Sequence, residues 1–190
     1  MLEELLARRG TTVDWWRDVS NKLNEGGVRN AAAGAIAANA YMPPRQTADF
    51  DLMIELDKLT TANEILTDDG WKFIGDLDRY ERLEGTAWRS LRDESRLVDV
   101  IGLPNDWGRT AIADAQDNVV GGIPTLTLPF LVITKLISSR AQDTADLARA
   151  LGAVDEAARE QVRATVRRYR LSDADDVDRL IELGKLEFGR

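Results

Sequence analysis

The chain has 190 residues, of which 44% are hydrophobic, and it contains neither cysteine nor histidine. These absences exclude disulfide bonds, thiolate or imidazole metal sites and every catalytic mechanism that needs a histidine base. The net charge is −8, from 33 acidic and 25 basic residues, which argues against a broad non-specific nucleic-acid surface. Acid–base or metal chemistry therefore falls to carboxylates, lysine, tyrosine or water, and the oxygen ligands suit Mg²⁺ or Mn²⁺.

The first third of the chain is expected to mix helices with short strands. Helices are predicted over 2–9 and 12–24. A short small-residue strand then leads to Gly34 and an alanine-rich helix, which the double proline of YMPPR ends. The apolar run TADFDLMIEL, residues 47–56, predicts a strand. The charged N-terminus has no signal-peptide core and no apolar run could span a membrane, so a cytoplasmic protein is expected.

The remaining elements divide the chain into two parts. A helix is predicted over 58–68, followed by four short strands over 71–76, 80–85, 87–94 and 96–103. After a mixed region over 104–124, helical periodicity continues over 129–139, 143–151, 155–169 and 173–186. The pattern predicts an α+β fold in which a small mixed sheet is flanked by helices. We expect a core of residues 1–124 and a C-terminal helical bundle, residues 125–190, packed on it.

Two aspartates lie one residue apart in the run TADFDLMIEL. Residues i and i+2 of a strand point to the same face, so Asp49 and Asp51 project together while Phe50 and Leu52 face the core. Like charges this close raise each other's pKa unless a cation neutralises them. Asp99, a lone acid in the apolar run RLVDVIG, is the expected third ligand from a neighbouring strand. Three such carboxylates can hold two divalent ions for an in-line phosphoryl displacement.

An Asp-x-Asp pair alone is not specific, because most examples are solvated turns or edge-strand acids. The residues upstream favour the metal interpretation. Gly34 and Ala35 stand between a predicted strand and a helix, shortly before the two aspartates. A glycine there allows close approach to a phosphate, and a helix N-terminus offers N–H groups and a positive dipole end. The sequence thus predicts a triphosphate-binding segment beside a metal pair.

These segments together resemble the polymerase-beta-type nucleotidyltransferases. That signature is an apolar residue, glycine and glycine or serine, then a spacer and Asp-x-Asp or Asp-x-Glu, with a third acid on a later strand. GAIAANAY and RQTADFDLMIE are similar to the AbiEii-like branch, which includes the MenT-type toxins of toxin–antitoxin and abortive-infection systems. The matching residues are Gly34, Ala37, Arg45, Thr47, Asp49 and Asp51. Ala35 stands where that branch has a second glycine.

The resemblance continues in TLTLPFLVITKLISSRAQDTADLARAL, where an apolar helix carries Lys135 and precedes Arg140, Asp143 and Asp146. Lys135 either extends to the surface or points into the site, where its ammonium would compensate triphosphate charge; the resemblance favours the second. Asp146 is expected to be functional. Arg140 and Asp143 are expected to orient the helix pair, with Asp143 also able to act as an N-terminal dipole partner.

The resemblance implies an enzyme that transfers a nucleoside monophosphate from an NTP to an acceptor hydroxyl, by similarity the 3′ end of tRNA. A cognate antitoxin is an implied partner. Asp99 is expected to take the hydroxyl proton. The expected metal ligands are Asp49, Asp51 and Asp99. The expected catalytic residues are these three with Lys135 and Asp146. The expected nucleotide-binding residues are Gly34, Ala35, Arg45, Thr47 and Lys135.

Two alternatives stay open. One is a nucleotidyltransferase that modifies a small molecule or a protein, which the acidic net charge mildly favours over an RNA substrate. The other is a nucleotide-binding or partner-binding module without turnover. Among the aromatic residues, Trp107 in a polar loop is the candidate for base stacking, whereas the other tryptophans are expected to pack. The basic segment RATVRRYR, residues 163–170, is either a contact for tRNA phosphates or a solvated helix face.

Overall fold

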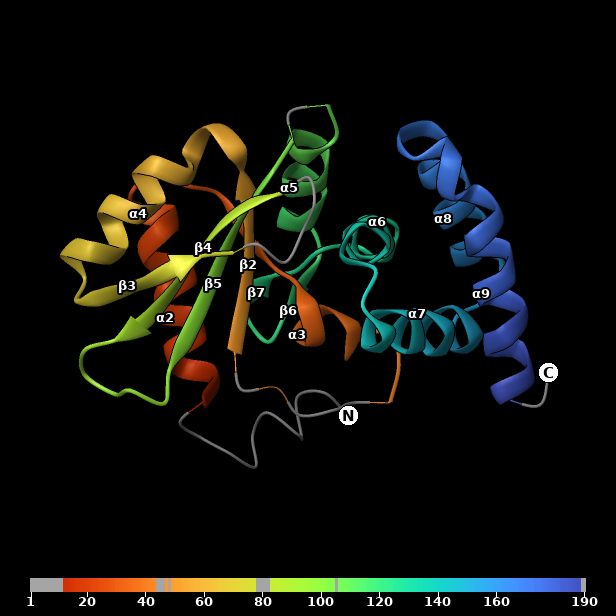
Figure 1. Ribbon diagram of the computed structural model, residues 1–190, viewed down its shortest axis with the longest axis horizontal. Coiled ribbons are helices and arrows are strands. Elements are labelled where there is room, and N and C mark those ends of the chain that lie inside the picture. The colour runs from red at the N-terminus through yellow and green to blue at the C-terminus, as the bar shows by residue number, and fades with distance from the viewer. Residues whose placement is uncertain (1–11, 44–46, 48, 78–82, 105, 189–190) are drawn as a thin grey trace.

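A five-stranded mixed sheet occupies one half of the molecule in the computed structural model (Figure 1). The structure describes residues 12–43, 47, 49–77, 83–104 and 106–188, so the helix predicted over 2–9 lies outside the described residues. The strand order is β1-β2-β5-β4-β3, with β2 parallel to β5 and the other neighbours antiparallel. The strands are β1 (Asn30–Ala32), β2 (Asp49–Glu55), β3 (Trp71–Asp76), β4 (Glu84–Ser90) and β5 (Leu97–Leu103).

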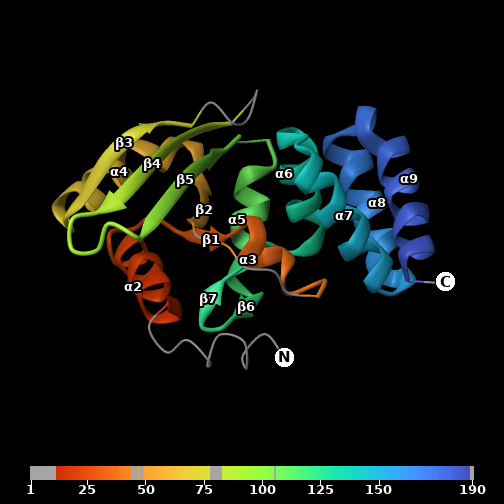
Figure 2. The ribbon, with the colours of Figure 1, turned by 60° about the horizontal axis from the view of Figure 1, so that its bottom comes forward.

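Helices surround the sheet and form a bundle at one end of it (Figure 2). The helices around the sheet are α2 (Thr12–Glu25), α3 (Gly34–Ala38), α4 (Leu59–Asp68) and α5 (Gly108–Gln116). The later helices are α6 (Leu128–Ser138), α7 (Ala141–Ala153), α8 (Glu156–Tyr169) and α9 (Ala174–Glu187). The small elements are β6 (Val119–Val120), β7 (Ile123–Pro124), and the 3₁₀ turns η1 (Leu56–Lys58) and η2 (Leu171–Asp173). This arrangement confirms the predicted α+β fold.

The period-2 pattern of β2 divides the core into two apolar clusters. Phe50, Leu52 and Ile54 belong to the cluster that α2 and α4 complete. Met53 belongs to the cluster that includes α3, α5 and α6. Because alternate residues of a strand face opposite sides, Asp49 and Asp51 share the side of Met53. The sequence alternation therefore turns the two acids away from α4.

Helices α7 and α9 of the bundle meet through glycines. A Cβ added at Gly184 on α9 would lie 2.0 Å from the carbonyl oxygen of Ala148 on α7. A Cβ added at Gly152 would lie 2.5 Å from the carbonyl oxygen of Gly184. The two backbones thus pack at a distance that only glycine permits. Within the described residues, no helix combines the length and the apolar character that a membrane span needs.

One prediction about the strands is wrong. Residues 80–85 and 87–94 were expected to form two strands, but β4 runs without a break from Glu84 to Ser90. It ends there because the Ser90 hydroxyl accepts hydrogen bonds from the backbone N–H groups of Arg92 and Asp93, which turns the chain toward β5. The division of the chain at residue 124 stays a prediction.

Candidate active site

The strand register brings the three predicted acids together. Asp51 on β2 pairs directly with Asp99 on β5 in the parallel ladder. Each of Asp49, Asp51 and Asp99 offers a carboxylate oxygen, and these atoms lie within 4.8 Å of one another. Asp99 is buried, with 5% of its surface exposed, and the other two are half-buried. The three carboxylates form a compact cluster of hard oxygen ligands.

The first residue of α3 lies against this cluster. Gly34 has φ +54°, and a Cβ there would fall 1.7 Å from Asp51 Oδ2. The backbone N–H of Ala33 donates to the carbonyl of Asp51 over 2.9 Å, which holds the segment against β2. Position 34 therefore requires glycine for two reasons. The backbone is left-handed there, and the Asp51 carboxylate occupies the space that a side chain would need.

A cavity of about 220 Å³ opens beside the acids. The residues that line it are Gly34, Ala35, Thr47, Asp49, Asp51, Lys135, Arg140 and Gln142. The Thr47 hydroxyl donates to Asp49 Oδ1 over 2.6 Å and so holds one of the acids in place. The cavity joins β2, α3 and the junction of α6 and α7. Of the residues expected to bind nucleotide, only Arg45 lies outside the described part of the chain.

Lys135 is buried on α6, with 5% of its side chain exposed. Its Nζ donates to Asp143 Oδ1 over 2.7 Å and to Asp146 Oδ2 over 2.9 Å, both on α7. The second oxygen of Asp146 accepts from Gln142 Nε2 over 2.9 Å. Lys135 therefore does not extend to the surface. It lines the cavity while two buried carboxylates hold its ammonium, and Asp146 contacts Lys135 from a fully buried position.

Asp143 accepts hydrogen bonds from other side chains as well as from Lys135. It accepts one from Arg140 Nε, over 2.7 Å, and another from the hydroxyl of Ser138. Burial raises the pKa of Asp143, but the hydrogen bonds from Arg140, Lys135 and Ser138 outweigh burial and hold the pKa below its usual value. Asp143 is therefore ionised at neutral pH, and the network joins α6 to α7.

Gln142 and Ser138 were not singled out in the sequence, although both belong to this network. Gln142 is separated from Asp146 by four residues, a spacing that places two side chains on the same face of a helix. That spacing was the available signal. Ser138 gave no such signal, since its contact to Asp143 depends on the turn between α6 and α7.

The structure shows that the base-stacking expectation for Trp107 is wrong. The indole is 3% exposed, and its ring stacks on Phe130 with 6.2 Å between centroids and 7° between planes. Both residues belong to the apolar cluster around α6. The polar composition of the loop suggested exposure, but the aromatic ring is a core residue and has no free face for a base.

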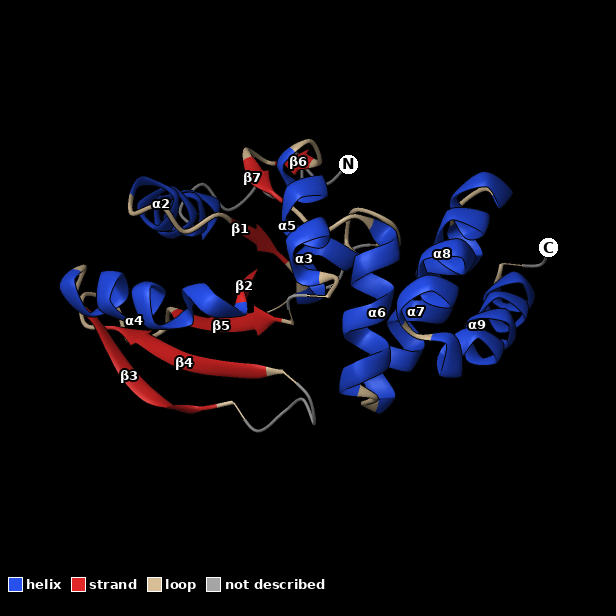
Figure 3. Ribbon diagram, turned by 90° about the horizontal axis from the view of Figure 1, so that it is seen from above, coloured by secondary structure: helices blue, strands red, loops and turns tan. Residues whose placement is uncertain are grey.

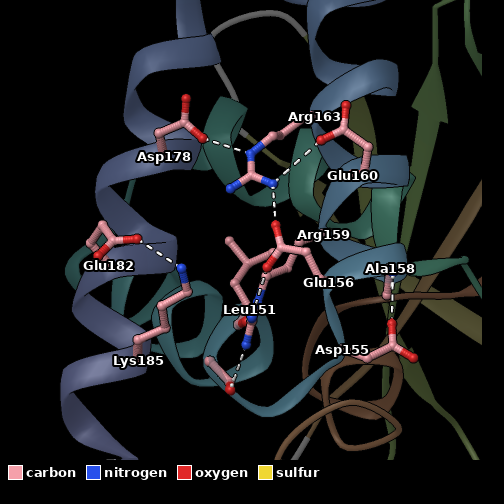
Figure 4. Close-up of polar contacts among 11 residues, drawn as sticks. Leu151, Asp155, Glu156, Ala158, Arg159, Glu160, Arg163, Asp178, Glu182 and Lys185 are labelled. Atoms are coloured by element: carbon pink, nitrogen blue, oxygen red, sulfur yellow. Dashed lines mark hydrogen bonds and ion pairs between the residues drawn. The ribbon is translucent and has the colours of Figure 1, made fainter. Parts of the chain in front are cut away.

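Acids pair with most of the arginines in the basic segment 163–170, as Figure 4 shows for Arg163. Arg163 bonds to Asp178 over 2.7 Å and to Glu156 over 2.7 Å. These hydrogen bonds raise the pKa of Arg163. Arg170 makes an ion pair with Asp173 over 2.7 Å. These contacts favour the interpretation of this segment as a solvated helix face over that of a phosphate-binding surface.

Solved structures share this fold, although no family model and no curated protein matches the chain. The solution structure of the antibiotic-resistance factor ANT(2'')-Ia has a TM-score of 0.52 and 15% identity, over 95% of this chain and 94% of that one. The crystal structure of ANT(2")-Ia in complex with adenylyl-2"-tobramycin has a TM-score of 0.51 and 15% identity, over 94% and 99%. The chain therefore has the fold of ANT(2'')-Ia.

Proposed function

We propose that the chain is a nucleotidyltransferase that moves a nucleoside monophosphate from an NTP to an acceptor hydroxyl. The observation that carries the proposal is the convergence of three carboxylates from β2 and β5 beside the glycine that opens α3. The fold shared with ANT(2'')-Ia over nearly the whole of both chains supports it. A binding module without turnover would not need three clustered carboxylates, two of which line a cavity.

The acid cluster fits Mg²⁺ or Mn²⁺. Three carboxylate oxygens within 4.8 Å of one another are the hard ligands that these ions prefer. Asp49 and Asp51 line the cavity, so the cluster is accessible from it. Bound divalent cations would neutralise triphosphate charge and stabilise the charge that develops during phosphoryl transfer. Asp49, Asp51 and Asp99 would hold them.

The reaction is an in-line displacement at the α-phosphorus. The acceptor oxygen forms a bond to that phosphorus, the bond to the bridging oxygen breaks, and pyrophosphate leaves. The acceptor proton passes to the carboxylate of Asp99, which stands at the inner end of the cluster. Lys135 faces the same cavity and adds positive charge near the triphosphate. Asp146 acts through Lys135 as a positioning residue.

The triphosphate lies along the start of α3. The N–H groups of Gly34 and Ala35 belong to the first turn, where a helix has no internal acceptors for them. Both residues line the cavity together with Thr47. Arg45 is proposed to contact the nucleotide as well, on the resemblance of RQTADFD to the AbiEii-like motif.

The acceptor proposed first is the 3′ end of tRNA, with the chain as the toxin of a toxin–antitoxin or abortive-infection system and a cognate antitoxin as partner. The motifs around Gly34, Asp49 and Lys135 support this assignment through their resemblance to MenT-type toxins. The second candidate is a small-molecule hydroxyl. It is favoured by the structural neighbour whose complex contains adenylyl-2"-tobramycin.

A labelling screen tests the proposal. The full chain is incubated with each labelled NTP, Mg²⁺ or Mn²⁺, and either total tRNA or tobramycin, and the label is followed into each acceptor. We expect Asp51→Asn to lower labelling by about a thousandfold, because metal stabilisation supplies several kcal/mol and each 1.4 kcal/mol is tenfold. Asp68→Asn on the exposed end of α4 is the matched control. Equal labelling by wild type and Asp51→Asn would remove the assigned site.

A further inference from the structure

The sheet face that carries the acids continues across β4 and β3. One row of paired residues crosses four strands, in the order Asp51, Asp99, Ala87 and Gly75. Paired residues lie on the same face, so Ala87 and Gly75 extend the surface beside Asp99. A Cβ added at Gly75 would meet nothing within 4 Å. Ala87 is partly buried against the apolar cluster that includes α6, and the face is open at Gly75.

The opposite face of these strands is the covered one. Thr86 of β4 donates to Asn63 of α4 over 2.9 Å, and Trp88 packs in the same apolar cluster as α4. Ala87 and Arg89 alternate with these residues and point away from α4. In Figure 3, α4 lies along one side of β3 and β4, and α6 stands at one end of these strands. The face of β4 that points away from α4 is therefore the face that carries Asp99 on β5.

Two cations stand directly opposite each other on this face. A second row, next to the first, runs in the order Asp49, Leu97, Arg89 and Lys72. Arg89 and Lys72 are both exposed, and neither makes an ion pair with another described residue. Like charges that face each other across strands destabilise a sheet. Although the protein is acidic overall, Lys72 and Arg89 form this unfavourable pair on the same sheet face as the acid cluster.

We propose that Lys72 and Arg89 bind phosphates of a single-stranded nucleic-acid acceptor whose terminal hydroxyl lies at Asp99. The inference rests on the proposed function and assigns the residues that hold the acceptor strand beside that site. Arg89 is two strands from Asp49, about 10 Å at roughly 4.8 Å per strand. That span equals about three stacked nucleotides at roughly 3.4 Å each. A polycationic small molecule would meet like charge on the same path, so the face selects a polyanion.

The test is the binding of a 5′-fluorescein-labelled single-stranded RNA of about 12 nucleotides, within the site sizes known for single domains. Fluorescence anisotropy of the full chain is measured over a series of salt concentrations. Lys72→Gln/Arg89→Gln is expected to weaken binding at least tenfold. It should also lower the salt slope by about 1.4, since each lost phosphate contact accounts for about 0.7. In transfer assays the same variant raises KM for RNA and leaves KM for the NTP unchanged.

Lys22→Gln/Lys58→Gln is the control, because it removes the same charge from exposed lysines on α2 and η1. If the control loses as much affinity as the test variant, the effect is one of net charge and the inference is overturned. Unchanged affinity of the test variant overturns it as well. Asp51→Asn separates the two proposals, since it is expected to abolish transfer and keep RNA binding. If Asp51→Asn loses transfer while Lys72→Gln/Arg89→Gln binds RNA as tightly as the wild type, that pair of results rejects the acceptor surface and leaves the proposed function standing.

Discussion

Gly34 and Asp51 are in such close contact that a Cβ on the glycine would lie 1.7 Å from the carboxylate oxygen Oδ2. The start of α3 and the strand β2 therefore cannot move independently. A phosphate bound at the start of the helix would lie next to the acid cluster. Nucleotidyl transfer needs the triphosphate and the metal ions to be adjacent in this way. The close packing of these two residues links nucleotide binding to the proposed metal site.

Gly34→Ala is expected to lower nucleotide binding and transfer together. The added methyl group would displace the Asp51 carboxylate, and the left-handed backbone would add about 1–3 kcal/mol of strain. Gly27→Ala is the matched control, because Gly27 also has a positive φ of +78° but a Cβ there meets nothing within 4 Å. Thermal unfolding and NTP titration measure both variants. Equal loss of transfer in the two would attribute the effect to backbone strain.

The position of the acid cluster could be predicted because it depends on local periodicity. The spacing of Asp49 and Asp51 sets their common face in any strand, and an isolated acid in the apolar run around Asp99 needs a polar partner. The parallel pairing that places Asp51 opposite Asp99 was not visible in the sequence, since parallel strands are joined by long connections. Asp99 was expected on a neighbouring strand because it is a lone acid in an apolar run, and the third acid of the family signature agreed with that choice.

The surroundings of Lys135 could not be predicted in the same way. An apolar helix accommodates a lysine that extends outward or one that is buried with partners, and the sequence of the helix is the same in both cases. Its partners Asp143 and Asp146 lie on the next helix, so the outcome depends on how α6 packs on α7. The base-stacking prediction for Trp107 was wrong for a related reason, because the composition of a loop does not reveal a tertiary contact such as the one to Phe130.

Lys135→Met is expected to destabilise the protein by about 3–5 kcal/mol, because it leaves two buried carboxylates without their common cation. The loss should appear as a lower midpoint in denaturant unfolding. Lys185→Met removes a lysine from a surface pair with Glu182 and should change stability by at most about 1 kcal/mol. A mild effect of Lys135→Met, similar to that of the control, would contradict the buried network.

Asp146→Asn separates positioning from stability. The amide keeps the shape of the side chain, and Lys135 keeps Asp143 as its ionic partner. If Lys135 contacts the triphosphate, the altered balance of charge around its ammonium should change KM for the NTP more than the free energy of unfolding. Steady-state kinetics at saturating acceptor, compared with urea unfolding, provides the two values. A loss of stability with unchanged KM for the NTP would assign Asp146 a structural role only.

Asp143 gives stability a defined pH dependence. Its folded-state pKa lies below the unfolded value, so the unfolded chain binds the proton more readily and protonation favours unfolding. The contribution is complete above the ordinary aspartate pKa of about 3.9 and is lost as pH falls through the lower folded value. The difference in unfolding free energy between wild type and Asp143→Asn should therefore be constant near neutral pH and shrink below about pH 4. A difference that stays constant into strong acid would contradict the assignment.

Gly184→Ala is expected to destabilise the packing of α9 on α7, although alanine favours a helix over glycine by about 0.8–1 kcal/mol. The added Cβ would lie 2.0 Å from the carbonyl oxygen of Ala148, so the helices must separate, and overpacking of this kind costs about 1–3 kcal/mol. The clash therefore exceeds the gain in helix propensity. Leu183→Ala, on the same helix and half-exposed, is the control and should change the unfolding midpoint little. A higher midpoint for Gly184→Ala would show that α7 and α9 do not touch through this glycine.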